Sequence, residues 1–193
     1  GGRLWGGFWE TMPREDRFRL IRIGTRLHPE GERTASVDLG QLYPRLLYLR
    51  EGLTPPEEDL YDIDGDGSCR DGWKRLVNAM AHAPKRLTHL PKGAQRLFPE
   101  GARPRDLINR VEKRHAPIAH LFGIGIGQKL ALQESTMLIL ALLDLQHRGV
   151  VGLPLHDSVI VGASEVQAAQ GAMTAAFRRL CGSACAKLSV DFG

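Results

Sequence analysis

Two aspartates far apart in the chain occupy positions that suit metal-binding carboxylates. Asp38 follows a short run of strand-forming residues, 34–37, and Asp157 lies at the tip of a predicted hairpin formed by residues 150–161. Phosphoryl transfer to a sugar hydroxyl requires charge to be neutralised on the attacking and the leaving oxygen, which two divalent ions on shared carboxylates achieve. Two Mg²⁺ ions are expected, because Mg²⁺ prefers hard oxygen ligands and substrate phosphates, and Mn²⁺ is the alternative. By spacing alone, the simpler interpretation is that each aspartate only stabilises a turn.

A second group of candidate residues is basic. Arg70 and Lys74 are four residues apart on a predicted helix, so both project from the same face. Further along, residues 85–114 contain nine Lys or Arg against three Asp or Glu. This stretch is interpreted either as a solvated loop and helix or as part of a path for nucleic acid.

Two other patterns imitate known ligand-binding loops. Residues 62–67 match the first half of an EF-hand loop, but Trp73 stands where the bidentate Glu of a calcium site is required. The glycine-rich run 122–127 lacks the strand and the spacing of a dinucleotide-binding fingerprint. We interpret the first as an acidic turn. The second is interpreted as a segment that lets the backbone approach a template or lets a helix start.

The elements that would position these residues belong to an α+β fold. Apolar periodicity and stop signals predict strands, helices and a hairpin in an order typical of an antiparallel sheet with helices on one face. Residues 1–33 are expected to be irregular, and Ser164 with Gln167 is expected to form a capping box. The long helix at 127–147 is apolar nearly all round in its middle, so it is expected to be buried. Strands are predicted at 34–37, 150–155, 159–161 and 187–191, and helices at 43–51, 69–83, 127–147 and from about 165 to 181.

The composition is that of an ordinary globular protein. Hydrophobic residues make up 42% and charged residues 25% of 193 residues, and the net charge of +4 fits a polyanionic partner without requiring one. Three cysteines without framework spacing indicate reduced thiols and a cytoplasmic setting. The longest apolar run is too short to span a bilayer, so no membrane partner is expected.

The order of these patterns resembles the catalytic core of family A DNA polymerases. The segment from Val37-Asp38 to Arg45 is similar to their motif A, and the segment from Arg70 to Asn78 is similar to motif B on the fingers helix. Leu155-His156-Asp157-Ser158, after a long helix that carries Gln133, resembles motif C. Weaker similarities are Gly2-Arg3-Leu4 with Pro13-Arg14 before motif A, and Asp59-Leu60-Tyr61 after it. Together these similarities cover nearly the whole chain.

The resemblance implies a role for each matching residue. Asp38 and Asp157 would bind the two metal ions. Lys74 would bind the incoming nucleotide and protonate the leaving pyrophosphate. The other implied nucleotide-binding residues are Arg70, Tyr43 and Asn78. The implied primer-template contacts are Arg3, Gln133 and His156, at the primer terminus and the minor groove.

The resemblance also implies an organisation and partners. The chain would be a single polymerase catalytic core, with a palm at about 1–52 and 128–193 and reduced fingers at about 53–127. It would contain no thumb and no exonuclease domain, so another protein or domain would supply the thumb function. Its partners would be a DNA primer-template and dNTPs, and it would be a cytoplasmic protein encoded by a bacterium, a phage or a mobile element.

Several positions depart from the family pattern. Tyr43 stands where motif A usually has Glu, Ser158 where motif C has a third acid, and Asn78 and His82 where motif B has aromatic residues. His-Asp-Ser also resembles motif C of single-subunit RNA polymerases, so the chain could instead be an RNA polymerase or primase. The bulky ring of Tyr43 favours deoxynucleotides. The chain could also be a non-catalytic nucleic-acid-binding palm or an unrelated α+β domain.

Overall fold

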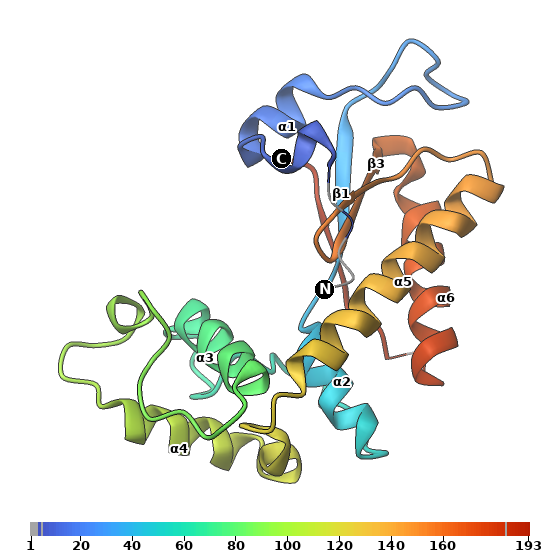
Figure 1. The fold of residues 1–193 in the computed structure, drawn as a ribbon. Helices are drawn as coiled ribbons and strands as arrows, with labels where there is room; N and C mark the ends of the chain where they lie inside the picture. Colours follow the sequence, from blue (N-terminus) through green and yellow to red (C-terminus); the bar gives the residue numbers. More distant parts are fainter. Residues whose placement is uncertain (1–3, 5, 184) are drawn as a thin grey trace. The chain divides into compact units, whose positions relative to one another are not determined.

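The computed structural model (Figure 1) describes residues 4, 6–183 and 185–193, and the chain divides into two compact units. The first unit comprises Gly1–Gly40 and Ala131–Gly193, and the second comprises Gln41–Leu130. The divisions at 40/41 and 130/131 differ from the predicted palm and fingers boundaries at 52/53 and 127/128. The first difference arises because the helix that follows Asp38 packs with later residues of the second unit.

The first unit is built on a four-stranded antiparallel sheet in the order β2-β3-β1-β4. The central pair is β1 (Thr34–Leu39) and β3 (Ser158–Gly162), while β4 (Leu188–Asp191) pairs with β1 and β2 (Leu153–Leu155) pairs with β3. The predicted α+β class, an antiparallel sheet backed by helices, is confirmed.

Successive side chains of β1 point to opposite faces of the sheet. Ala35 and Val37 are fully buried, and they lie opposite Val161 and Val159 of β3. Figure 1 shows α5 (Gly127–His147) and α6 (Val166–Cys181) together on one side of the sheet and α1 (Arg14–Leu20) on the other. The alternate residues, Ser36 and Asp38, are therefore left on the face turned toward α1.

The expectation that residues 1–33 are irregular is wrong. They contain the short helix η1 (Phe8–Glu10) and α1, because Ile21 and Ile23 bury apolar surface against Ile160 and so fix the segment to the sheet. The indole Nε1 of Trp9 donates a hydrogen bond of 2.7 Å to the carbonyl oxygen of Pro154.

The predicted capping box at Ser164 is also wrong. Ser164 lies in the short helix η4 (Ala163–Glu165), and both its amide and its hydroxyl donate to the carboxylate of Glu32. Glu165 precedes α6 without a side-chain cap. A partner 132 residues away in the sequence thus replaces the local one.

The long helix α5 has the predicted bounds, but it is not buried all round. Met137, Ala141 and Leu145 are fully buried, whereas Leu132, Ile139 and Leu143 are 61%, 39% and 45% exposed. Within the described residues, no helix combines the length and the hydropathy needed to cross a membrane.

The second unit is helical. Its elements are α2 (Leu42–Arg50), α3 (Arg70–His82), η2 (Gln95–Leu97), α4 (Pro104–Arg114) and η3 (Ala116–Leu121). The i, i+3, i+4, i+7 spacing of Trp73, Leu76, Val77 and Met80 places one face of α3 against α4. The opposite face of α3 is left for polar residues.

The glycine-rich run packs closely on the end of α3. The amides of Gly123 and Gly125 donate to the carbonyl oxygens of Met80 and Ala83, at 3.0 and 2.7 Å. A Cβ at Gly123 would lie 2.7 Å from the backbone nitrogen of Arg86, and one at Gly127 would lie 2.2 Å from Nδ1 of His82. The run thus satisfies the last carbonyl groups of α3 and then starts α5, as the interpretation of a helix start predicts, while approach to a template stays a prediction.

A buried histidine links three segments of the second unit. His115 is fully buried, and its Nδ1 lies 3.2 Å from the hydroxyl of Tyr48 while its Nε2 lies 2.9 Å from the carbonyl oxygen of Leu60. Burial lowers the pKa of His115 to about 4. The imidazole is therefore neutral at pH 7, with Nε2 as the donor to Leu60.

Candidate catalytic site

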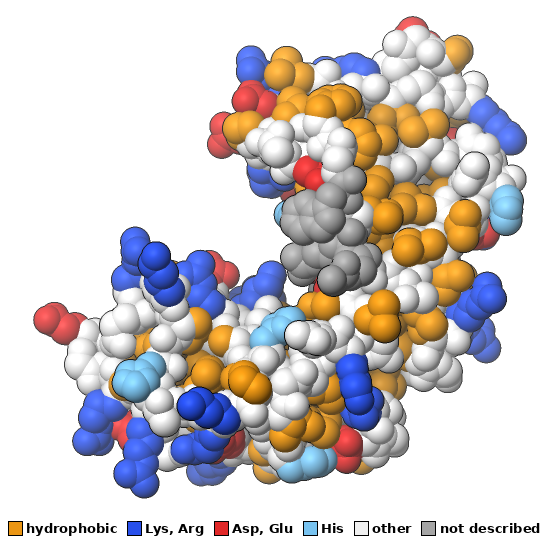
Figure 2. Space-filling model, viewed as in Figure 1, with side chains coloured by type: hydrophobic (Ala, Val, Ile, Leu, Met, Phe, Trp, Pro, Cys, Tyr) orange, Lys and Arg blue, Asp and Glu red, His pale blue; other side chains and the backbone are white. Residues whose placement is uncertain are grey.

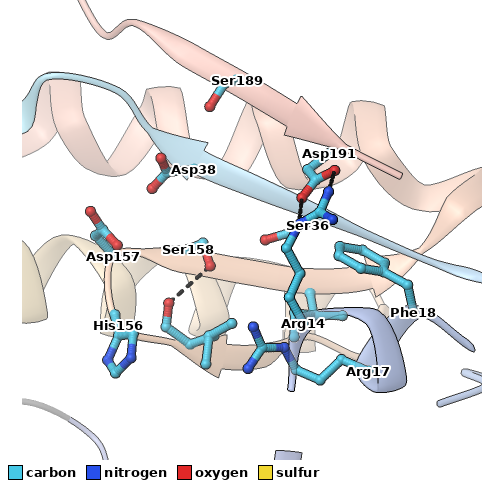
Figure 3. Close-up of a pocket in the computed structure, with 12 residues that line it drawn as sticks. Arg14, Arg17, Phe18, Ser36, Asp38, His156, Asp157, Ser158, Ser189 and Asp191 are labelled. Atoms are coloured by element: carbon cyan, nitrogen blue, oxygen red, sulfur yellow. Dashed lines mark hydrogen bonds and ion pairs between the residues drawn. The ribbon is translucent and has the colours of Figure 1, made fainter. Parts of the chain in front are cut away.

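Sheet register brings Asp38 and Asp157 to the same end of the sheet. Asp38 on β1 lies directly opposite Ser158 on β3, and Asp157 is the residue immediately before Ser158. Directly opposed residues have Cβ atoms about 5 Å apart, so Asp38 lies close to Ser158 and thus to the hairpin loop that carries Asp157. Both are half-buried and both line one pocket of about 300 Å³ (Figure 3).

A two-residue turn holds Asp157 in place. Leu155 and Ser158 form the closing pair of the β2–β3 hairpin, so His156 and Asp157 are its loop. His156 has a left-handed φ of 55°, which is uncommon outside glycine. The hydroxyl of Ser158 donates to the carbonyl oxygen of Leu155 at 2.8 Å. Ser158 thus closes the hairpin at the position where the family pattern has a third acid.

Sequence reasoning assigned no site role to the other polar residues of this pocket. Ser36, Ser189 and Asp191 enter it from β1 and β4, and Arg14 and Arg17 enter it from α1 (Figure 3). The alternation of strand side chains could have identified Ser36, which lies two residues before Asp38. Nothing local in the sequence indicates that the last strand, which carries Asp191, pairs with β1.

Arg14 and Asp191 form a two-point ion pair inside the pocket. Nε and Nη2 of Arg14 donate to Oδ2 and Oδ1 of Asp191, at 2.9 and 2.5 Å. This hydrogen bonding raises the pKa of Arg14 and lowers the pKa of Asp191. Both groups therefore remain charged throughout the neutral range.

The predicted nucleotide-binding residues of α3 lie along one helix face. Arg70, Lys74, Asn78 and His82 recur every four residues, and Lys74 and His82 are exposed. Arg70 is ion-paired with Asp59, and hydrogen bonding to that carboxylate raises the pKa of Arg70.

The segment that contains Asp59 supports this face of α3. The guanidinium of Arg70 lies 5.7 Å above the ring of Tyr61, whose hydroxyl donates to Oδ1 of Asn78 at 3.1 Å. The segment Asp59-Leu60-Tyr61 therefore holds the side chains of Arg70 and Asn78 in place. An incoming phosphate would have to compete with Asp59 for Arg70.

Tyr43 packs against the other end of the same face. Its ring centroid lies 5.4 Å from that of His82, and its side chain is 9% exposed. Two positions that depart from the family pattern thus contact each other. The ring of Tyr43 is fixed by packing, which suits a residue that excludes a substituent by its bulk.

The predicted primer-template residues are placed differently from one another. His156 is exposed and lines the pocket with Asp38 and Asp157. Gln133 lies half-buried on α5 and is not among the residues that line this pocket. Arg3 lies outside the described residues.

The donor set of the pocket fits Mg²⁺ completed by substrate. Among the described residues, no group of three or more His, Cys, Asp or Glu could hold a metal ion. Mg²⁺ commonly takes only one or two protein carboxylates, and substrate phosphates and waters supply its remaining oxygen ligands. Asp38 and Asp157 would be the residues that hold it.

The acidic turn at 62–67 is closed by its own backbone and by a cation. Oδ1 of Asp62 accepts the amides of Gly65 and Gly67, at 2.9 and 3.1 Å, and Asp64 is ion-paired with Arg110. Arg110 therefore neutralises one of the carboxylates that a calcium ion would need.

Basic residues are distributed over the surface of the second unit. Figure 2 shows Lys and Arg side chains on the part of the molecule that contains α3 and α4. All nine basic residues of the stretch 85–114 are exposed, and three of them, Arg86, Arg103 and Arg110, form ion pairs. This distribution suits contact with a polyanion.

Comparison of the chain with protein-family models and with curated protein sequences found no match. The residues and their geometry are therefore the basis for a function. The first unit contributes the carboxylate pair at one end of its sheet, and the second contributes the basic face of α3.

Proposed function

We propose that this chain is the catalytic core of a template-directed DNA polymerase of the family A type, which adds deoxynucleotides to a primer 3′-hydroxyl. The observation that carries the proposal is the position of Asp38 and Asp157. They are far apart in sequence, yet they lie on paired segments of one sheet and line one pocket. The motif resemblance assigns the metal-binding role to these same two residues.

The backbone pairing around Asp38 and Asp157 supports a catalytic role for this end of the sheet. Asp38 is held by a strand paired on both sides, and Asp157 by a two-residue loop. Carboxylates fixed in this way do not have to reorganise as charge develops in the transition state. With Mg²⁺ bound, charge on the attacking and leaving oxygens would be neutralised at this position.

The proposed nucleotide-binding residues act as a group on α3. Arg70 and Lys74 would provide two cations one turn apart for the triphosphate, and Lys74 would donate a proton to the departing pyrophosphate. The fixed ring of Tyr43 would lie against the sugar. His156, beside Asp157, would contact the primer terminus.

Primer extension on a labelled hairpin tests the proposal. The wild-type protein should add dNTPs with Mg²⁺ and should bind without extending when Ca²⁺ replaces it. Asp38→Asn and Asp157→Asn should each reduce extension by at least ~1000-fold, because each removes a charge that stabilises the transition state. Asp106→Asn, which removes an exposed carboxylate paired with Arg103, is the matched control and should retain activity.

Parallel reactions with rNTPs separate the competing functions. Preferential use of rNTPs would favour an RNA polymerase or primase. Binding of primer-template without extension under any of these conditions would favour a non-catalytic palm. Near wild-type extension by either asparagine variant would disprove the assignment of the catalytic site.

A further inference from the structure

The ion pair between Arg14 and Asp191 joins the two ends of the described chain at the candidate catalytic pocket. Arg14 is the first residue of α1 and Asp191 is the last residue of β4, 177 positions later. Figure 3 shows the pair beside Ser36, in the pocket that Asp38 and Asp157 also line.

The carboxylate is the fixed member of this pair. Asp191 lies opposite Ser36 in the β1–β4 ladder, and its Oδ1 also accepts the amide of Gly193 at 3.1 Å. Arg14 extends from an exposed helix end through a long, flexible side chain. The two-point contact therefore orders the guanidinium more than it orders the carboxylate.

The main effect of this ion pair is to place the Arg14 guanidinium in the pocket. The side chains of Arg14 and Asp191 are 53% and 45% exposed, and ion pairs this exposed add little to folding stability. The contact uses Nε and Nη2 of Arg14, so the Nη1 donors take no part in it. Arg17, by contrast, donates through Nη1 to the carbonyl oxygens of Trp9 and Met12.

We propose that Asp191 is a positioning residue that holds the Arg14 guanidinium in the pocket of Asp38 and Asp157, where Arg14 meets a backbone phosphate of the bound nucleic acid. This inference rests on the proposed polymerase function. Charge-assisted hydrogen bonds from a pre-ordered guanidinium suit a phosphate diester, and backbone contacts of this kind set the register of a nucleic acid. Asp191 acts through Arg14 and touches no reacting atom.

Asp191→Asn provides the primary test, because it removes the charge while keeping the size of the side chain. Loss of one ordered, charge-assisted contact should raise the Kd for primer-template, measured with Ca²⁺, by about tenfold. The KM for primer-template should rise with it, whereas the KM for dNTP and kcat should stay within about twofold. Asp191→Glu should restore most of the affinity.

Two further variants distinguish positioning from a merely structural role. Exchange of the two residues, Arg14→Asp with Asp191→Arg, keeps an ion pair and should leave thermal stability near the wild-type value, but it should not keep the affinity, because it moves the cation onto β4. Asp16→Asn breaks the exposed Arg19–Asp16 pair on the same helix, outside the pocket, and should leave the Kd unchanged.

Each contrary result is distinct. An unchanged Kd for Asp191→Asn, or an exchange variant that keeps the wild-type affinity, would overturn the positioning role while leaving the polymerase proposal intact. A wild-type protein that neither binds nor extends primer-template would overturn both proposals together.

Discussion

At the scale of single residues, the packing of Tyr43 against His82 leads to a prediction about which nucleotide sugar is selected. Tyr43 is buried, so its ring cannot easily move away from a ribose 2′-oxygen placed against it. Tyr43→Ala should therefore raise ribonucleotide use relative to deoxynucleotide use by roughly tenfold to a hundredfold, a shift of ~1–3 kcal/mol. The measurement is the ratio of kcat/KM values for matched rNTP and dNTP.

Tyr43→Phe keeps the ring and is the control for this experiment. Its sugar preference should remain that of the wild type, because the proposed exclusion is steric rather than hydrogen-bonded. If Tyr43→Ala leaves the ratio unchanged, Tyr43 is not the sugar-selecting residue.

His115 predicts how stability depends on pH. The folded protein depresses the pKa of this imidazole to about 4 from 6.5, so between those values the unfolded chain binds more protons. Stability should be fully present above pH 6.5 and should fall as the pH is lowered toward 4. At pH ~5 the expected loss from this residue is about 2 kcal/mol.

Urea unfolding of wild type and His115→Gln at several pH values checks this prediction. The glutamine variant can still hydrogen-bond but does not titrate. It should therefore lose less stability than the wild type between pH 7 and pH 5. Parallel pH profiles for the two proteins would contradict a buried, neutral histidine.

At the scale of elements, the connection between α3 and α5 depends on glycine. Gly123 has a φ of 75°, and a Cβ there would approach the backbone of Arg86. Gly123→Ala should destabilise the protein by at least ~2 kcal/mol, since a backbone clash adds to the left-handed strain.

Gly65→Ala is the matched control for this substitution. Gly65 has a φ of 78°, but a Cβ there would meet no atom within 4 Å, so this variant isolates the conformational strain. The control should cost only about 1 kcal/mol. If thermal unfolding shows equal losses of stability for the two variants, the close packing at Gly123 does not contribute to stability.

Elements with strong local signals were predicted well from the sequence. The bounds of α5 agree with the predicted bounds, and those of α3 differ from the predicted bounds by one residue at each end. Both helices are long and periodic and have clear stop signals, so nearby residues determine where they begin and end. Helix α1 was missed because Ile21 and Ile23 find their partner on β3, well over one hundred residues later. The predicted capping box at Ser164 is wrong for the same reason, because the hydrogen-bond partner of Ser164 is Glu32, which is distant in the sequence.

The same distinction applies to the site. Motif order selected Asp38 and Asp157 as candidate metal ligands, and both line one pocket, but pairing of β4 with β1 is what brings Asp191 into that pocket. The support that Asp59 and Tyr61 give to α3 likewise depends on tertiary packing. Residues whose role arises from contacts between distant segments leave little local signal.

At the scale of the whole molecule, the net charge of +4 predicts salt-dependent binding of primer-template. Release of counterions from about four phosphate contacts would weaken binding roughly 100-fold between ~50 and ~200 mM salt. Fluorescence anisotropy of a labelled hairpin with Ca²⁺ measures this dependence. A flat titration would argue against phosphate recognition and favour an unrelated α+β domain.

The hydrogen bond from Trp9 to Pro154 has a consequence for solubility. β2 is an edge strand, and exposed edges invite strand addition by other molecules and hence aggregation. Pro154 offers no amide hydrogen, and its carbonyl oxygen is already taken by the indole of Trp9. The β2 edge therefore offers fewer backbone groups to a strand of another molecule. This lets the hairpin stay exposed to solvent with a lower tendency to aggregate.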